Sequence, residues 1–180
     1  MTVKTFSGAD VLGSYLQKPA GFGGWLKTVF QTEEVKIQIS LPTRCFLRLE
    51  MFCEDVQEYC STVNNPLELD FSIMVELLLE DVVSYYGKTN NVLTLHKQFQ
   101  SLEKLPLVIG SQAQKKEKFT IQLDRKLVFR LEMLLADISE FEDHNYSVER
   151  VLTLCLLNFL SEIFRGNGQA VQKSIIKRLK

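Results

Sequence analysis

Six polar side chains occupy alternate positions in two short stretches of the sequence. They are Lys36, Gln38 and Ser40 in the first stretch and Lys118, Thr120 and Gln122 in the second. Their ammonium, carboxamide and hydroxyl groups donate and accept hydrogen bonds, and the set includes neither an acid nor a large apolar group. The chemistry that such a set offers is recognition of a partner with matching donors and acceptors.

The side chains that separate these six are apolar, and this alternation predicts the local structure. The apolar set is Val35, Ile37, Ile39 and Leu41 in the first stretch and Phe119, Ile121 and Leu123 in the second. Successive side chains of a strand point to opposite faces. Each stretch is therefore predicted to be a short strand with one polar and one apolar face.

After each strand the spacing of apolar residues becomes helical, over 45–60 and again over 127–141. Following a polar break, a second helix is expected at about 72–86 and at about 148–164. Both second helices carry apolar residues on almost every side. We therefore expect both of them to be buried on every side.

The two halves of this pattern are related in sequence. With an offset of 82 and no gap, residues 36–59 and 118–141 share nine identities in 24 positions. The repeated residues are Lys36, Ile39, Leu41, Arg48, Leu49, Glu50, Met51, Asp55 and Glu58. The sequence thus predicts one unit of strand, helix and helix that is used twice.

A repeated strand, helix and helix resembles the ribbon-helix-helix family, the Arc/MetJ-like DNA-binding proteins. The resemblance implies a mainly α fold with a two-stranded antiparallel ribbon, which enters the major groove of double-stranded DNA. In that family two chains each supply one strand. A duplicated ribbon-helix-helix would supply both strands from one chain and form an intramolecular pseudo-dimer.

The resemblance also gives the six polar side chains a role, as DNA base-reading residues. Lysine can donate to O6 and N7 of guanine, glutamine can bond adenine in bidentate fashion, and serine or threonine serves either base. The expected base-reading residues are Lys36, Gln38, Ser40, Lys118, Thr120 and Gln122.

Contacts to phosphate are expected next to the second copy. In the family, backbone amides at the start of the second helix often hold a DNA phosphate. Ser147 is the predicted N-cap of that helix and Arg150 is close by, so both are expected to contact phosphate. Lys115 and Lys116 lead into the second strand and are expected to add contacts of the same kind. Ser72, which has acids on both sides, is expected only to cap its helix.

Five segments are expected along the chain. They are an N-terminal arm over 1–33, copy one over 34–86, a linker with a short helix over 87–116, copy two over 117–164, and a basic tail over 165–180. The arm either lies along a DNA backbone or packs its aromatic side chains over an exposed edge of the core. Pro42 is expected to end the first strand, and Asp124 to cap the helix after the second strand.

The distribution of charge motivates an alternative function. The formal net charge is −1, and nine acids but no Lys or Arg lie between Glu50 and Asp81. A block of this kind repels DNA. The alternative is a ribbon-helix-helix-derived protein-interaction module that does not bind DNA. Self-association of pseudo-dimers is compatible with either function.

Composition excludes several other classes of protein. Hydrophobic residues make up 46% of the chain and charged residues 24%, as in ordinary soluble globular proteins. We expect a cytoplasmic protein, because no apolar run is long enough to span a membrane and no secretory signal is evident. The four cysteines lack Cys-x-x-Cys spacing and are expected to be reduced packing residues.

Neither a metal nor a cofactor is expected, since the two histidines have no partner at ligand spacing. We do not expect an enzyme, because the sequence has no phosphate-binding loop, no Gly-x-Ser-x-Gly and no plausible Cys–His pair. The expected function is sequence-specific DNA binding, in a regulator of transcription or of plasmid maintenance.

Overall fold

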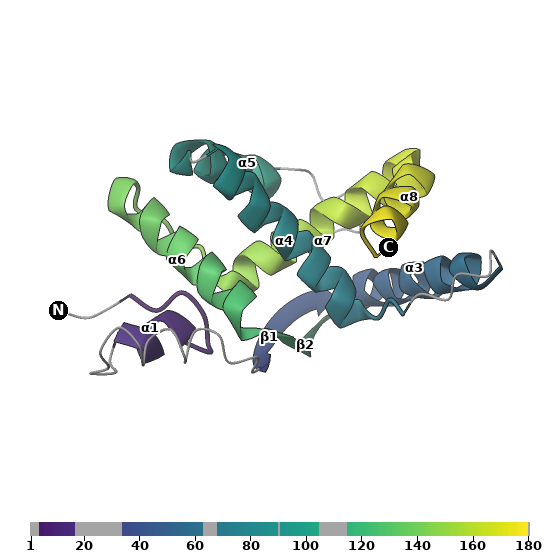
Figure 1. Ribbon diagram of the computed structural model, residues 1–180, viewed down its shortest axis with the longest axis horizontal. Coiled ribbons are helices and arrows are strands. Elements are labelled where there is room, and N and C mark those ends of the chain that lie inside the picture. The colour runs from purple at the N-terminus through teal and green to yellow at the C-terminus, as the bar shows by residue number, and fades with distance from the viewer. Residues whose placement is uncertain (1–3, 17–33, 63–67, 90, 105–114, 180) are drawn as a thin grey trace.

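The computed structural model describes residues 4–16, 34–62, 68–89, 91–104 and 115–179, which leaves most of the predicted arm outside the described residues. In chain order the elements are α1 (Val11–Leu16), β1 (Glu34–Pro42), α3 (Thr43–Thr62), α4 (Phe71–Thr89), α5 (Val92–Lys104), β2 (Lys116–Asp124), α6 (Arg125–Phe141), α7 (Val148–Glu162), η1 (Ile163–Asn167) and α8 (Gly168–Leu179). The described chain is mainly helical, and its two strands form one antiparallel sheet. A mainly α fold with a two-stranded antiparallel ribbon is therefore confirmed (Figure 1).

The ribbon joins β1 to β2 along nine residues of each strand. Ile37, Ile39 and Leu41 on the inner face of β1 are buried, while the polar residues between them are exposed. The alternation that predicted the strand thus also predicted which face is covered. Strand β1 ends at Pro42, as expected for a residue without a backbone N–H.

Two of the three predicted helix caps are confirmed. The side chain of Asp124 accepts hydrogen bonds from the backbone N–H groups of Lys126 and Leu127, and the side chain of Ser147 accepts one from Arg150. The prediction for Ser72 is wrong, because α4 already begins at Phe71, and the side chain of Asp70 accepts the hydrogen bond from the N–H of Ile73 at 2.7 Å. A carboxylate at this position is also stabilised by the positive end of the helix dipole.

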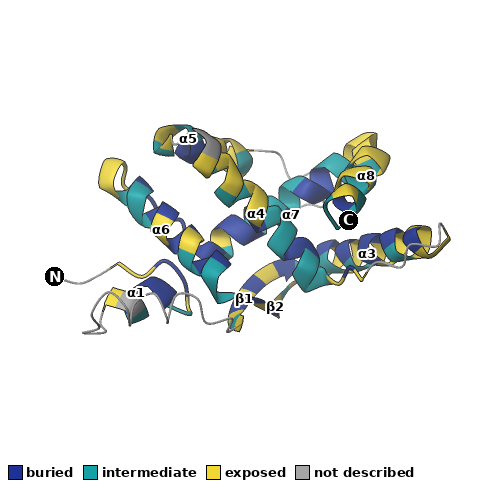
Figure 2. Cartoon of the chain, viewed as in Figure 1, coloured by how far each residue is buried: buried dark blue, intermediate teal, exposed yellow. Residues whose placement is uncertain are grey.

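Elements from the two halves of the sequence interlock in the core. Helix α7 packs against β1, and α4 packs against β2, so each second helix covers the strand of the other half. The two helices also contact each other, above the ribbon in Figure 1. One continuous apolar core runs through both halves, and Figure 2 shows its buried residues on the inward sides of these elements.

Burial of the second helices is unequal. Helix α7 has eight buried residues. Among the α4 residues whose burial is described, 71–87, only Met74, Val75 and Leu79 are buried, and most of the other apolar residues are half-buried. The expectation that both helices are covered on every side is therefore wrong for α4. Its neighbours leave part of its surface open, next to a cavity described below.

The N-terminal segment is anchored by a buried acid of α6. The carboxylate of Glu132 is fully buried and accepts hydrogen bonds from the hydroxyl of Ser7 and from the N–H groups of Val11 and Leu12. Glu50, which aligns with Glu132 at the offset of 82, is instead half-buried. Two identical residues of this alignment thus have different surroundings.

Residues 165–180, expected as a basic tail, form an additional folded element up to residue 179. Gly166 adopts φ 91° within η1, a conformation that favours glycine, and the chain then continues into α8. Helix α8 contacts α3 and buries Ile175, and Arg178 forms ion pairs with Glu80 and Asp81. This part of the chain is therefore docked on the core.

Candidate nucleic-acid interface

The six predicted base-reading residues lie together on one face of the ribbon. All six side chains are exposed, and the register places Lys36 opposite Gln122, Gln38 opposite Thr120, and Ser40 opposite Lys118. Directly opposite residues of an antiparallel pair project to the same side of the sheet. The polar face is therefore a continuous strip, three residue pairs long, with no apolar residue in it.

The opposite face of the ribbon fixes this strip in place. Ile37 and Ile121 face each other there and are both almost fully buried. Phe119 is half-buried and stacks on Phe46 of α3, with ring centroids 3.9 Å apart and an angle of 12° between the rings. The strip is thus backed by packed side chains, which reduces the entropy lost when it engages a partner.

Charge is distributed unevenly along the ribbon. At one end Lys116 pairs with Pro42, and Lys118 follows on the exposed face. At the other end Glu34 lies opposite Asp124. The ribbon consequently has a basic end and an acidic end, and the basic end is the better match for a phosphate backbone.

The two lysines predicted to contact phosphate before β2 lie at the basic end. The backbone carbonyl of Lys115 accepts a hydrogen bond from the N–H of Thr43 at 3.3 Å, so it is tied to the start of α3. Its ammonium group forms an ion pair with Glu117 at 3.2 Å. Lys116 is exposed and is the first residue of β2. Both residues are exposed, and the ion pair between Lys115 and Glu117 is weak because its lysine is open to solvent.

At the start of α7 the structure brings Ser147 and Arg150 together, but with partners inside the chain. The guanidinium of Arg150 donates to Glu103 of α5 at 3.0 and 3.2 Å. The N–H of Val148 donates to the carbonyl of Phe6 at 2.8 Å. A phosphate at this helix start would have to displace these contacts, so the ribbon is the better placed of the two predicted surfaces.

Seven of the nine acids between Glu50 and Asp81 fall into two groups, and the remaining two are the half-buried Glu50 and the exposed Glu68. Four of them have structural partners: Asp70 caps α4, Glu76 accepts a hydrogen bond from the N–H of Asp124, and Glu80 and Asp81 pair with Arg178. Burial raises the pKa of Glu76, against the opposing effect of its hydrogen bond from Asp124.

The second group lies along α3, where Glu54, Asp55 and Glu58 are exposed. A helix rises about 1.5 Å per residue, so these three acids begin about 16 Å beyond Thr43, the first residue of α3. Helix α3 runs outward from the ribbon (Figure 1). Glu54, Asp55 and Glu58 are therefore displaced along α3 from the polar strip instead of lying beneath it.

Sequence reasoning did not predict a cavity that is lined by residues of α4, α5, α7 and α8, away from the ribbon. The available signal was the surplus of apolar residues on α4, which exceeds what its neighbours cover. Among the described residues no group of His, Cys, Asp or Glu side chains is arranged to hold a metal ion.

No protein-family model matches the chain, and no similar protein was found among curated sequences or among solved structures. Within the described ranges, none of the helices combines the length and apolar character needed to cross a bilayer.

Proposed function

We propose that this protein binds double-stranded DNA in a sequence-specific manner, with the β1–β2 ribbon in the major groove. The observation that carries the proposal is the exposed strip of six hydrogen-bonding side chains on a two-stranded antiparallel ribbon. The major groove is wide enough for such a ribbon, and its base edges present the complementary groups. A regulator of transcription or of plasmid maintenance is the cellular role that fits.

The register supports a duplicated ribbon-helix-helix with an intramolecular pseudo-dimer. Gln38 lies opposite Thr120, which is also its equivalent in the sequence repeat. Lys36 lies opposite Gln122, the equivalent of Ser40. A two-fold axis through the central pair would produce this register. The exchange of second helices, with α7 on β1 and α4 on β2, has the same symmetry.

The same register defines what the ribbon would read. Each end of the strip carries one lysine, Lys36 at one end and Lys118 at the other, so each half of the DNA site should contain guanine. The lysines are accompanied by different residues, Gln122 and Ser40 respectively. We therefore expect an imperfect palindrome, with adenine specified next to guanine in one half only.

Selection from random-sequence DNA tests the proposal. The protein should enrich one short motif, and the double variant Gln38→Ala with Gln122→Ala should lose it. A good bidentate contact contributes about 1–3 kcal/mol of discrimination. We therefore expect at least a tenfold loss of preference for the motif. Both side chains are exposed, so the fold should be unaffected.

The matched control replaces Gln98 of α5 and Gln169 of α8, two exposed glutamines outside the ribbon, with Ala. This variant should select the same motif as the unchanged protein. Unchanged selection by the ribbon variant would show that the strip does not read bases.

A protein-interaction module is the second candidate, and the outer face of α3 favours it. Leu47 and Met51 are 52% and 51% exposed there, close to the acids described above. An apolar face with an acidic border suits a partner with an apolar patch and basic rim. Recovery of a stoichiometric partner that Met51→Lys abolishes, from a protein without salt-dependent DNA affinity, would establish this function instead.

A further inference from the structure

A cavity of about 300 Å³ lies between four helices: α4, α5, α7 and α8. This volume is at the lower end of the range for small-molecule sites. The helices α5 and α8 that border it lie on the other side of the molecule from the ribbon (Figure 1). The cavity is therefore separate from the strip proposed to bind DNA.

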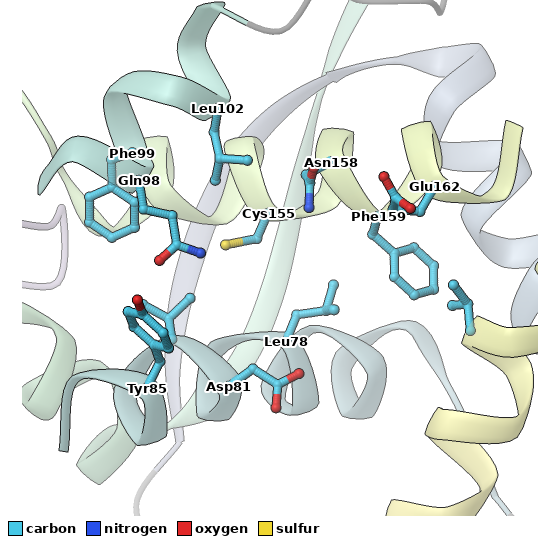
Figure 3. A pocket seen from close by; sticks show the side chains of 12 residues that line it. Leu78, Asp81, Tyr85, Gln98, Phe99, Leu102, Cys155, Asn158, Phe159 and Glu162 are labelled. Atoms are coloured by element: carbon cyan, nitrogen blue, oxygen red, sulfur yellow. The ribbon is translucent and has the colours of Figure 1, made fainter. Parts of the chain in front are cut away.

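Apolar side chains make up most of its walls. Phe99 of α5 and Phe159 of α7 are nearly buried and contribute aromatic rings, and Leu78 of α4 contributes an aliphatic surface. Figure 3 shows these three side chains around the open space. Walls of this kind favour a flat apolar body, which displaces water from the rings and the aliphatic groups.

Two carboxamide groups belong to the polar part of the lining, beside the hydroxyl of Tyr85 and the carboxylates of Asp81 and Glu162. Figure 3 shows Gln98 of α5 and Asn158 of α7 extending toward the space from helices on adjacent sides. Within the described part of the chain, neither amide group has a hydrogen-bond partner. Each can donate and accept, so together they match a ligand edge that presents both a donor and an acceptor.

The charges at the cavity disfavour an anion. Its lining includes Asp81 and Glu162 but neither Lys nor Arg among the described residues. Arg178 binds Asp81 at 2.7 Å and Arg165 binds Glu162 at 3.0 Å, so both carboxylates are already neutralised from outside the cavity. An anion would meet these two carboxylates with no cation in the described lining to compensate it, whereas an uncharged ligand leaves both exposed ion pairs in place.

We propose that this cavity is a binding site for a small, planar, uncharged heteroaromatic molecule. The apolar body of the ligand lies against Phe99 and Phe159, and its adjacent donor and acceptor pair with the carboxamides of Gln98 and Asn158. The site does not depend on DNA binding, and its test does not use DNA.

Titration monitored by backbone amide NMR tests the site with three probes. Quinolin-2-one is planar and uncharged, with neighbouring N–H and C=O groups. Naphthalene has a similar body without a polar edge, and 2-oxo-1,2-dihydroquinoline-4-carboxylate adds a negative charge. Quinolin-2-one should bind saturably, with shifts concentrated at the lining residues of α4, α5 and α7, and the other two probes should bind at least fivefold more weakly.

Variants locate the contacts. Asn158→Leu should weaken the binding of quinolin-2-one at least fivefold and leave the binding of naphthalene unchanged. Gln98→Leu should do the same, and because Gln98 is exposed it remains informative if Asn158→Leu disturbs the fold. Gln169→Leu, an exposed position of α8 outside the lining, is the matched control and should have no effect.

Three results would overturn the assignment. Shifts that do not saturate, or that lie away from the cavity, would show that it does not bind this class. Equal or tighter binding of the carboxylate would reject the uncharged ligand. Unchanged affinity for quinolin-2-one in both Leu variants would show that the carboxamides do not contact the ligand.

Discussion

At the scale of single residues, His144 shows how a local hydrogen-bond pattern selects one protonation state. The ring is nearly buried, and its Nδ1 accepts a hydrogen bond from the N–H of Tyr146 at 3.0 Å. The proton of the neutral ring must therefore lie on Nε2, which is 3.0 Å from the carbonyl of Leu135. A second proton would place two donors face to face at Nδ1.

The pKa of His144 is accordingly lowered from its usual value of 6.5, mainly by burial. Electrostatic interactions with Lys4 and with the His96 side chain lower it further, whereas the hydrogen bond to Leu135 and the carboxylate of Asp143 act in the opposite direction. At pH values between the lowered pKa of His144 in the folded chain and its usual pKa of 6.5, this side chain binds more protons in the unfolded chain than in the folded chain. The contribution to stability is thus complete above about pH 6.5 and is lost as pH falls through the folded value.

We predict that His144→Gln flattens the dependence of unfolding free energy on pH below pH 6.5. One proton accounts for a slope of at most about 1.4 kcal/mol per pH unit. Urea unfolding at several pH values between 5 and 8 measures it, with His96 unchanged in both proteins. The variant should be less stable at pH 8 because it disturbs a buried site. An identical slope in the two proteins would assign the pH dependence to other groups.

At the scale of elements, the two strands lead into their helices by different chemistry. At the end of β2 the side chain of Asp124 accepts from Lys126 at 2.6 Å and from Leu127 at 3.1 Å. At the end of β1 the first helical residue, Thr43, bonds only weakly with its hydroxyl, to the carbonyl of Lys115 at 3.4 Å. The start of α6 therefore depends on one side chain, and the start of α3 does not.

We predict that Asp124→Ala lowers the free energy of unfolding by about 1–2 kcal/mol, the usual cost of a lost N-cap. Thr43→Ala, the matched change at the other strand end, should cost less than half as much. Chemical denaturation of the two variants at pH 7 gives both values. Equal losses would mean that the hydrogen bonds of the Asp124 side chain are not what stabilises this boundary.

Helices and strands could be predicted from the sequence where the spacing of apolar residues matched a single type of element. The alternation around Ile37 and Ile121 predicted the strands and their buried faces. The cap of α4 was missed because Ser72 and Asp70 are both good caps, and their choice depends on where the helix begins. Contacts between distant segments carry no local signal, which is why neither the anchoring of the N-terminal segment by Glu132 nor the docking of α8 was predicted.

In the candidate site, too, the local pattern was predictable and the long-range contacts were not. The sequence predicted the six residues of the strip, since strand alternation alone puts them on one face. It did not predict that Arg150 pairs with Glu103, which lies 47 positions earlier in the chain. Nor did it predict the cavity, since a cavity is the space that neighbouring helices leave unfilled.

At the scale of the whole molecule, the interlocked core determines what can fold alone. The segment before residue 105 contributes β1, α3, α4 and α5, and the segment after residue 114 contributes β2, α6, α7 and α8. The ribbon, the contact of α7 with β1 and that of α4 with β2 all join the two segments. Each segment by itself would expose the apolar faces that the other covers, at a cost of about 25 cal/mol per Å².

We therefore predict that cutting the chain between residues 105 and 114 leaves one folded complex of two fragments, not two domains. A protease site inserted there allows the cut to be made on folded protein. The fragments should elute together, and their unfolding should become dependent on concentration. Each tenfold dilution should lower the free energy of unfolding by about 1.4 kcal/mol, because the linker no longer supplies an effective concentration of order mM.

The control is the protein with the inserted protease site before cleavage, which should unfold independently of concentration. Fragments that separate on size exclusion, each with its own cooperative transition, would show that the halves are independent domains and that the exchanged helices do not hold them together.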